Sequence, residues 1–166
     1  VVARSNDHYG IPDRQFVTHT SKAKTIDQTD LQEIAENHVR LSLELQKAFG
    51  LRREEATSFS RALRMRSQQI TQSNRLKASW TKGGKERSIP IRNEEQRTLL
   101  ERIKREVGNG SLIPADRNYV QQLRIYERQT ANAGLSRMHG LRHAYVQQRY
   151  QELTGWLSSR LPGDRL

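Results

Sequence analysis

Four stretches of hydrophobic residues at helical spacing, each followed by a glycine, constrain the fold of this chain more than any other feature. The stretches cover about residues 30–49, 93–107, 116–133 and 139–154. The glycines that follow them are Gly50, Gly108, Gly134 and Gly155. Residues that recur every three or four positions share one face of a helix, and glycine readily takes the left-handed conformation that ends many helices. The sequence therefore predicts four main helices.

The predicted helices have recognisable starts and buried faces. Asp30 is expected to cap the first helix, which Asn37 can divide in two, and Asn93 is expected to cap the second. Arg52 begins a further helical turn directly after the first glycine. The residues expected to face inward from the third helix are Val120, Leu123, Tyr126 and Thr130. Those that recur along the fourth are Leu141, Tyr145, either Gln148 or Arg149, and Leu153.

Between residues 61 and 92 the pattern changes to a short alternation that is typical of strands. Leu76, Ala78 and Trp80 share one face of one expected strand, and Ile89 and Ile91 share a face of another. The segment Lys82-Gly83-Gly84-Lys85 is the expected turn, since glycine supplies the positive φ of a tight hairpin. The predicted fold class is α+β, mainly helical, with a small antiparallel β-sheet.

The length of 166 residues suits one domain with its own core. Residues 1–29 are rich in polar residues, contain Gly10 and Pro12, and indicate a linker or an extended arm. The domain is expected over residues 30–156, and residues 157–166 are expected to form a tail.

The charge of the chain indicates a polyanionic partner. Lys and Arg number 29 against 18 Asp and Glu, which gives a net charge of +11 spread along the whole sequence. A basic folded surface of this kind favours nucleic acid. No hydrophobic run is long enough to cross a membrane, and the N-terminus lacks the hydrophobic core of a signal peptide. The absence of cysteine excludes disulfides and thiolate metal sites and suits a cytoplasmic protein.

His139 and Arg142 form a first chemical motif. Because they stand three positions apart at the start of a predicted helix, they lie on the same face of that helix. A helix start favours an anion, the guanidinium can hold two phosphate oxygens, and the imidazole can move a proton. By itself this pair is a weak indication of a phosphate site.

Two further motifs precede this pair, and together the three resemble the catalytic domain of the tyrosine recombinases, the phage-type integrases. The family patterns are Gly-Leu-Arg-x-x-Glu, Lys-Gly-x-x-Lys-Glu-Arg and His-x-Leu-Arg-His, in that order. The matching segments are Gly50-Leu51-Arg52-Arg53-Glu54-Glu55, Lys82-Gly83-Gly84-Lys85-Glu86-Arg87 and His139-Gly140-Leu141-Arg142-His143. The resemblance covers about residues 30–156.

The resemblance implies cleavage and rejoining of double-stranded DNA through a phosphotyrosine intermediate, without a metal or a cofactor. Arg52 and Arg142 would hold the non-bridging oxygens of the scissile phosphate. Lys82 would protonate the leaving 5′ oxygen, and His139 would assist proton movement.

The resemblance also implies supporting roles and partners. Glu55 would orient the side chain of Arg52 or His139, and His143 would be a supporting or core histidine. The expected contacts with DNA phosphates are Arg53, Lys85 and Arg87. A protein of this family would assemble with further copies on DNA, in the cytoplasm of a bacterium and associated with its nucleoid.

The nucleophilic tyrosine of the family pattern is not evident. It stands about thirty residues after the arginine of the third motif, whereas 24 residues follow Arg142. Tyr145 and Tyr150 fall within the helix of the motif itself, and Tyr145 is spaced like a core residue. The domain is therefore expected to be incomplete at its C-terminal end, through truncation or a disrupted gene, and not to complete cleavage alone.

Three other functions remain open at this point. The first is a recombinase remnant that binds DNA and cuts nothing. The second is a metal-dependent nuclease built on His139 and His143, although residue 140 is glycine where a zinc-binding helix would carry glutamate. The third is a purely structural basic protein, which the ordered series of three motifs disfavours.

Overall fold

The computed structural model describes residues 21–59, 73–76, 87–108 and 110–156. These residues form six helices and one two-stranded antiparallel sheet, which confirms a mainly helical fold with a small sheet. In chain order the elements are α1 (Gln28–Gln32), α2 (Asn37–Phe49), α3 (Arg53–Thr57), β1 (Ser73–Leu76), β2 (Arg87–Pro90), α4 (Glu94–Val107), α5 (Tyr119–Asn132) and α6 (His139–Thr154).

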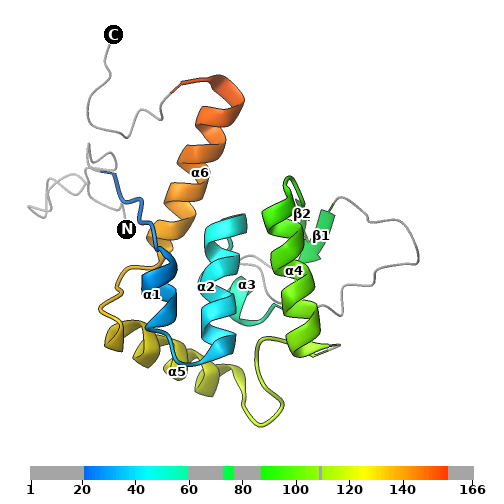
Figure 1. The fold of residues 1–166 in the computed structure, drawn as a ribbon, viewed down its shortest axis with the longest axis vertical. Helices are drawn as coiled ribbons and strands as arrows, with labels where there is room; N and C mark the ends of the chain where they lie inside the picture. The colour runs from blue at the N-terminus through cyan, green and yellow to red at the C-terminus, as the bar shows by residue number, and fades with distance from the viewer. Residues whose placement is uncertain (1–20, 60–72, 77–86, 109, 157–166) are drawn as a thin grey trace, which may run out of the picture.

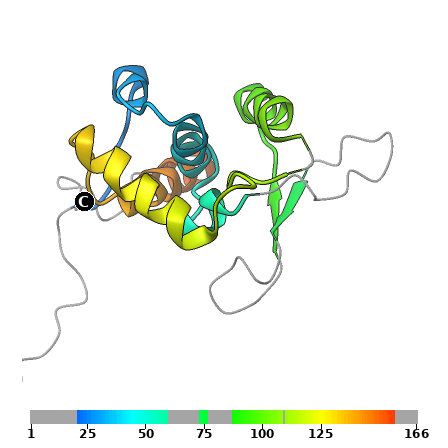
Figure 2. The same cartoon turned by 90° about the horizontal axis from the view of Figure 1, so that it is seen from below.

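Helix α2 is the central element of the fold. It packs against α3, α4, α5 and α6 (Figures 1 and 2). Leu41, Leu45 and Phe49 recur at a spacing of four and face α4 and the sheet, whereas Val39 and Leu43 face α1, α5 and α6. A helix with hydrophobic residues on two faces is buried on both sides, so α2 separates two cores.

The two cores draw on different parts of the chain. The first joins α2 and α4 to β2, with buried residues that include Ile89, Leu99 and Ile103. The second joins α1, α5 and α6, with buried residues that include Leu31 and Leu141. The sheet therefore lies on the α4 side of α2, and the C-terminal helix lies on the other side (Figure 2).

The first predicted helix is divided, as Asn37 allowed, but its caps differ from the prediction. Asp27, not Asp30, caps α1, and the two aspartates form a reciprocal capping box. Glu36 caps α2 in extended conformation, with its carboxylate accepting a hydrogen bond from the N–H of Val39 at 2.8 Å. The chain can break between the helices because a carboxylate satisfies the first free N–H groups of each new helix.

The predicted second helix is confirmed as α4, with Asn93 as its cap. The third begins later than predicted, at Tyr119, because Asn118 caps it. Its inward face is confirmed at Tyr126 and Thr130, which are buried, but not at Val120, which is 52% exposed. The polar Gln122 is fully buried instead. The side chain of Gln122 accepts a hydrogen bond from Arg117 at 3.0 Å, which offsets the cost of burying its oxygen.

The end of α6 does not pack against the described part of the fold. Leu141 is buried, but Leu153 is 73% exposed, so its expected inward position was wrong. Figure 1 shows the second half of α6 extending past α2. Val146, Tyr150 and Trp156 are exposed on the same part of the chain.

Strands β1 and β2 confirm the predicted antiparallel pairing. Ser73 lies opposite Pro90 and Leu76 lies opposite Arg87. Ile89 is buried, whereas Ile91 follows the end of β2. The expected strand residues Ala78 and Trp80 and the expected turn at residues 82–85 lie outside the described residues.

The segment before α1 is packed from residue 21 onward, although the sequence indicated an arm there. Ile26 is 2% exposed and belongs to the second core. The N–H of Lys24 donates to the carbonyl of Gly140 at 3.0 Å. A Cβ at Gly140 would lie 2.7 Å from the carbonyl oxygen of Lys22, so only glycine allows this segment to cross the start of α6.

Candidate functional site

The first motif forms a tight corner between α2 and α3. Gly50 ends α2 with a φ of +62°, and its N–H donates to the carbonyl of Gln46. Leu51 is buried in the first core, and Arg52 is the extended residue that precedes α3. This left-handed turn favours glycine, because a side chain is disfavoured there. Arg52 is thus fixed at its backbone by a buried neighbour and a helix start.

Glu55 fixes the same corner from inside. Its side chain is 1% exposed, and Oε2 accepts a hydrogen bond from the N–H of Arg52 at 2.9 Å. Sequence reasoning gave Glu55 the role of orienting Arg52 or His139. The observed bond holds the backbone of Arg52, which determines where its guanidinium starts.

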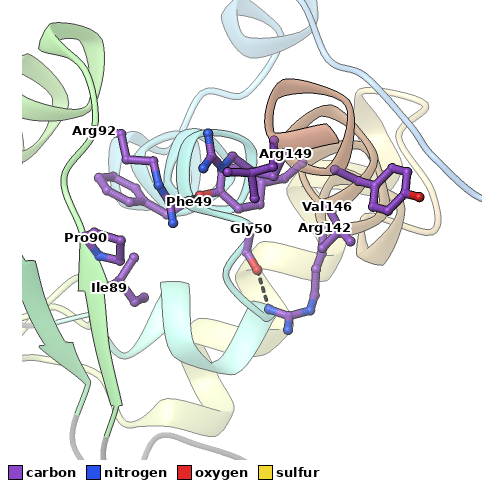
Figure 3. A pocket seen from close by; sticks show the side chains of 11 residues that line it. Phe49, Gly50, Ile89, Pro90, Arg92, Arg142, Val146 and Arg149 are labelled. Atoms are coloured by element: carbon purple, nitrogen blue, oxygen red, sulfur yellow. Dashed lines mark hydrogen bonds between the residues drawn. The ribbon is translucent and has the colours of Figure 1, made fainter. Parts of the chain in front are cut away.

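Arg142 joins the third motif to the first. Its guanidinium donates a hydrogen bond to the carbonyl oxygen of Gly50, two residues before Arg52 (Figure 3, dashed line). Arg142 lies in the first turn of α6, and α6 packs against α2. Two motifs that are 92 residues apart in sequence therefore meet at one corner.

A groove of about 580 Å³ lies beside this corner. Its lining includes Arg52, Arg53 and His139, which the sequence had singled out, and Arg137, which it had not. Arg137 is exposed and has a φ of +55°, in the left-handed region that is unusual for a residue with a side chain. No pattern in the sequence marks such a conformation, because Arg137 lies in a short connection between α5 and α6.

Arg53 is engaged with carboxylates on the rim of this groove. Its guanidinium lies 2.9 Å from Glu127 and 3.8 Å from Glu54. All three side chains are more than a third exposed, so these ion pairs are weak. An incoming phosphate can compete with them for Arg53.

His139 and His143 lie one turn apart on α6. Their rings meet edge to face, with centroids 5.1 Å apart and an interplanar angle of 83°. His139 is exposed and His143 is half-buried. Among the residues that the structure describes, no group of three or more His, Cys, Asp or Glu side chains could hold a metal ion.

A second pocket, of about 410 Å³, is lined by Arg142, which does not line the first groove (Figure 3). Phe49, Gly50, Ile89 and Pro90 form part of its wall, and Arg92, Arg142 and Arg149 bring positive charge to it. Sequence reasoning gave neither Arg92 nor Arg149 a part in a site. Arg92 follows β2 and Arg149 lies on α6, and no local pattern reveals that both residues line the same pocket.

The buried Tyr126 of α5 also forms part of the wall of the 580 Å³ groove. Burial raises the pKa of Tyr126 to about 12, although a hydrogen bond from Gln46 and the charge of Arg53 oppose the shift. Burial also raises the pKa of Tyr119, with a further contribution from the charge of Glu54. Both hydroxyl groups are therefore held in the protonated form.

The remaining predicted site residues are only partly described. Lys82 and Lys85 lie outside the described residues. Arg87 is the first residue of β2, and its backbone pairs with Leu76. The site can therefore be built from Arg52, Glu55, His139 and Arg142.

The part of the chain that the structure describes has no helix long and apolar enough to span a bilayer.

Comparisons with known proteins bear on the family and the fold of the chain. A family model described as Integrase matches residues 10–148. The crystal structure of a lambda integrase (75–356) dimer bound to a COC′ core site is similar, with a TM-score of 0.53 and 18% sequence identity. That match covers 87% of this chain and 62% of the other, so this chain spans less than two thirds of that neighbour. No curated protein matches the chain.

Proposed function

This chain belongs to the integrase family and has the fold of a tyrosine recombinase catalytic domain, and from this premise we propose that it acts in site-specific recombination of double-stranded DNA. The reaction class is strand cleavage and rejoining through a phosphotyrosine intermediate, as in integration of a phage or mobile element. The phosphodiester energy is retained in the covalent link, so the reaction needs no nucleotide cofactor.

The observation that carries this proposal is the bond between Arg142 and Gly50. It places the start of α6 at the corner that fixes Arg52. Arg52 and His139 line one groove beside that corner. Two guanidinium groups and an imidazole near one corner can neutralise the charge that builds on a phosphate in the transition state.

Each residue has a proposed part in this reaction. Arg52 and Arg142 hold the non-bridging oxygens, and His139 assists proton movement. Lys82 protonates the leaving 5′ oxygen, because an ammonium group can deliver a proton while its charge stabilises the pentavalent state. Glu55 supports Arg52 through the backbone bond already described.

The remaining predicted residues are proposed not to contact the scissile phosphate directly. His143 packs against His139 and limits the orientations of that ring. Arg53, Lys85 and Arg87 contact neighbouring DNA phosphates. The similar lambda integrase was solved as a dimer on its core site, which supports duplex DNA and further copies of the chain as partners.

We infer that the nucleophile is not among the tyrosines of the described residues. Tyr145 and Tyr150 lie on the helix of the third motif itself, close to Arg142, and burial raises the pKa of Tyr119. The hydroxyl of Tyr145 accepts a hydrogen bond from Arg92. Tyr126 is buried against Gln46, and a pKa of about 12 disfavours its ionised form. This chain alone is therefore expected to bind DNA without completing cleavage.

The substitution Arg142→Lys tests the proposal. Lysine keeps the charge but cannot hold two phosphate oxygens at once, so we expect cleavage to fall by about a hundredfold or more. DNA affinity should change by less than about threefold, since one cation among many contributes little to binding. Cleavage is measured with the longest reading frame that contains this chain, and affinity with the chain itself.

The matched control is Arg105→Lys, on the exposed side of α4, which should leave both quantities unchanged. Equal losses of cleavage and affinity in Arg142→Lys would contradict the role given to Arg142. A protein that binds DNA but never cleaves it, with a tyrosine present after α6, would favour a remnant that only binds DNA. Loss of cleavage on addition of EDTA would favour a metal-dependent nuclease instead.

A further inference from the structure

Tyr145 contacts two other segments of the proposed site. It lies on α6, three residues after Arg142. Its ring covers the corner at Gly50 so closely that a Cβ added to Gly50 would lie 2.4 Å from the ring atom Cδ1. Its hydroxyl accepts a hydrogen bond from the guanidinium of Arg92, 53 residues earlier in the chain.

The contact with Gly50 lies next to the groups proposed to hold phosphate. The carbonyl of Gly50 accepts the hydrogen bond from Arg142, and Arg52 follows two residues later. The ring of Tyr145 thus packs on the same glycine that Arg142 binds. Any shift of α6 along α2 would disturb both contacts together.

The contact with Arg92 reaches the end of the β-sheet. Arg92 follows β2 by two residues, and β2 follows the proposed acid Lys82 in sequence. The N–H of Arg92 donates to Oε1 of Gln96 at 2.7 Å, and Nε2 of Gln96 donates to the carbonyl of Ala48 at 2.7 Å. Arg92 is therefore held to α2 through its backbone and to α6 through its side chain.

We propose that Tyr145 is a positioning residue that holds the three segments of the site in register: the Gly50 corner, the start of α6 and the exit of β2. The assignment rests on the proposed function, because it takes the segments of that site as those being aligned. The hydroxyl is the essential group, since phenylalanine would keep the ring over Gly50 but could not accept the bond from Arg92.

Hydrogen exchange of the chain, measured without DNA, tests the link. Tyr145→Phe should raise the exchange rates of the backbone amides of Ser88, Ile89, Ile91 and Arg92 by roughly fivefold to tenfold, the size expected for loss of one exposed hydrogen bond. Arg92→Met should have the same effect. The double variant should add nothing further, because either change removes the same bond.

A local effect separates positioning from general stability. The amides of α5 between residues 122 and 126 should exchange at the wild-type rate in all three variants, and Tyr150→Phe, on the exposed part of the same helix, should change nothing. Unchanged exchange at the amides of Ser88, Ile89, Ile91 and Arg92, an equal rise in α5, or additive effects in the double variant would overturn the proposal.

Measuring the affinity for duplex DNA distinguishes a failure of the positioning role from a failure of the proposed function. Tyr145→Phe should bind duplex DNA within about twofold of wild type, since its hydroxyl is proposed to contact Arg92 and not phosphate. A wild-type chain with no affinity for duplex DNA would overturn the proposed function, whatever the exchange rates show. A large loss of affinity confined to Tyr145→Phe would assign Tyr145 to DNA contact and overturn the positioning role.

Discussion

Gly50 carries two separate constraints at the scale of a single residue. Its φ of +62° is disfavoured for residues with a side chain, and a Cβ would meet the ring of Tyr145 at 2.4 Å. Gly134 carries only the first constraint, with a φ of +67° and no atom within 4 Å of an added Cβ. The two glycines look alike in sequence, because each follows a helical pattern.

We therefore expect Gly50→Ala to lower the free energy of unfolding by roughly 2–4 kcal/mol, through backbone strain and overpacking together. Gly134→Ala should cost about 1 kcal/mol, from strain alone. Urea denaturation of the two variants checks the difference. Equal losses would mean that the ring of Tyr145 moves away without cost.

Tyr126 illustrates how far sequence reasoning reaches at this scale. Its inward position followed from helical spacing and is confirmed, since it is 3% exposed. Its partner Gln46 could not be predicted, because a buried glutamine is stable only where a second polar group meets it. Val120 and Gln122 reverse the expected pattern for the same reason, since the partner of Gln122 lies outside α5.

At the scale of secondary-structure elements, the stability that the packing of α2 against α5 gives the fold depends on pH, because Tyr126 is buried in this contact. Tyr126 has a pKa raised to about 12 in the folded chain, above its ordinary value of 10.0. Below pH 10 the hydroxyl is protonated in the folded and in the unfolded chain, so its titration does not change the free energy of unfolding. Between pH 10 and 12 the unfolded chain releases the proton and the folded chain does not, so the folded state loses stability as pH rises.

A shift of this size corresponds to a loss of roughly 2–3 kcal/mol across that interval. Tyr126→Phe should lack this component, so the free energy of unfolding should fall less steeply with pH than in wild type. Because lysine ionisation is common to both proteins, the difference between them isolates Tyr126. Tyr150→Phe, at an exposed position, should follow wild type, and parallel curves for wild type and Tyr126→Phe would contradict the buried environment of the hydroxyl.

Most of the helices could be predicted from the sequence, whereas the tertiary contacts between them could not. The helical spacing and the glycines gave α2, α4, α5 and α6 with the correct type and approximate limits. The bond from Arg142 to Gly50 joins residues 92 positions apart, and the bond from Arg92 to Tyr145 joins residues 53 apart. Such contacts depend on how α6 packs against α2 and on where the segment after β2 lies, and local patterns carry no information about that packing.

Gly140 shows the same limit within a motif. Sequence comparison with the family pattern left this position undefined, since the pattern reads His-x-Leu-Arg-His. The structure explains glycine there, because the carbonyl of Lys22 and the side chain of Lys24 lie within 3 Å of an added Cβ. Glycine at position 140 is therefore required by the segment around Lys22 and Lys24, which is distant in sequence and crosses the start of α6.

At the scale of the molecule, the distribution of charge among the described residues distinguishes two faces as possible binding sites for DNA. Helix α4 carries four acidic residues, at positions 94, 95, 101 and 106, and four basic residues, at 97, 102, 104 and 105. It contributes nothing to the net charge of +11. The groove at the proposed site has a net charge of +1 with His139 neutral, because three arginines outnumber two carboxylates among its lining residues: Arg52, Arg53 and Arg137 against Glu54 and Glu127. We expect the DNA to lie over the groove and not over α4.

Salt dependence measures this placement directly, because each phosphate contact releases counterions and adds about 0.9 to the slope of log affinity against log salt. Wild-type affinity for duplex DNA should fall steeply with salt, on the order of a thousandfold between 50 and 200 mM if about six phosphates are contacted. Arg137→Gln should lower the slope by about 1, whereas Arg105→Gln, which removes the same charge from α4, should leave it unchanged. Both substitutions remove one positive charge, so an effect of net charge alone would change the two slopes equally. A phosphate bound at the groove would lower the slope only in Arg137→Gln. Equal slopes in the two variants would therefore place the interface elsewhere.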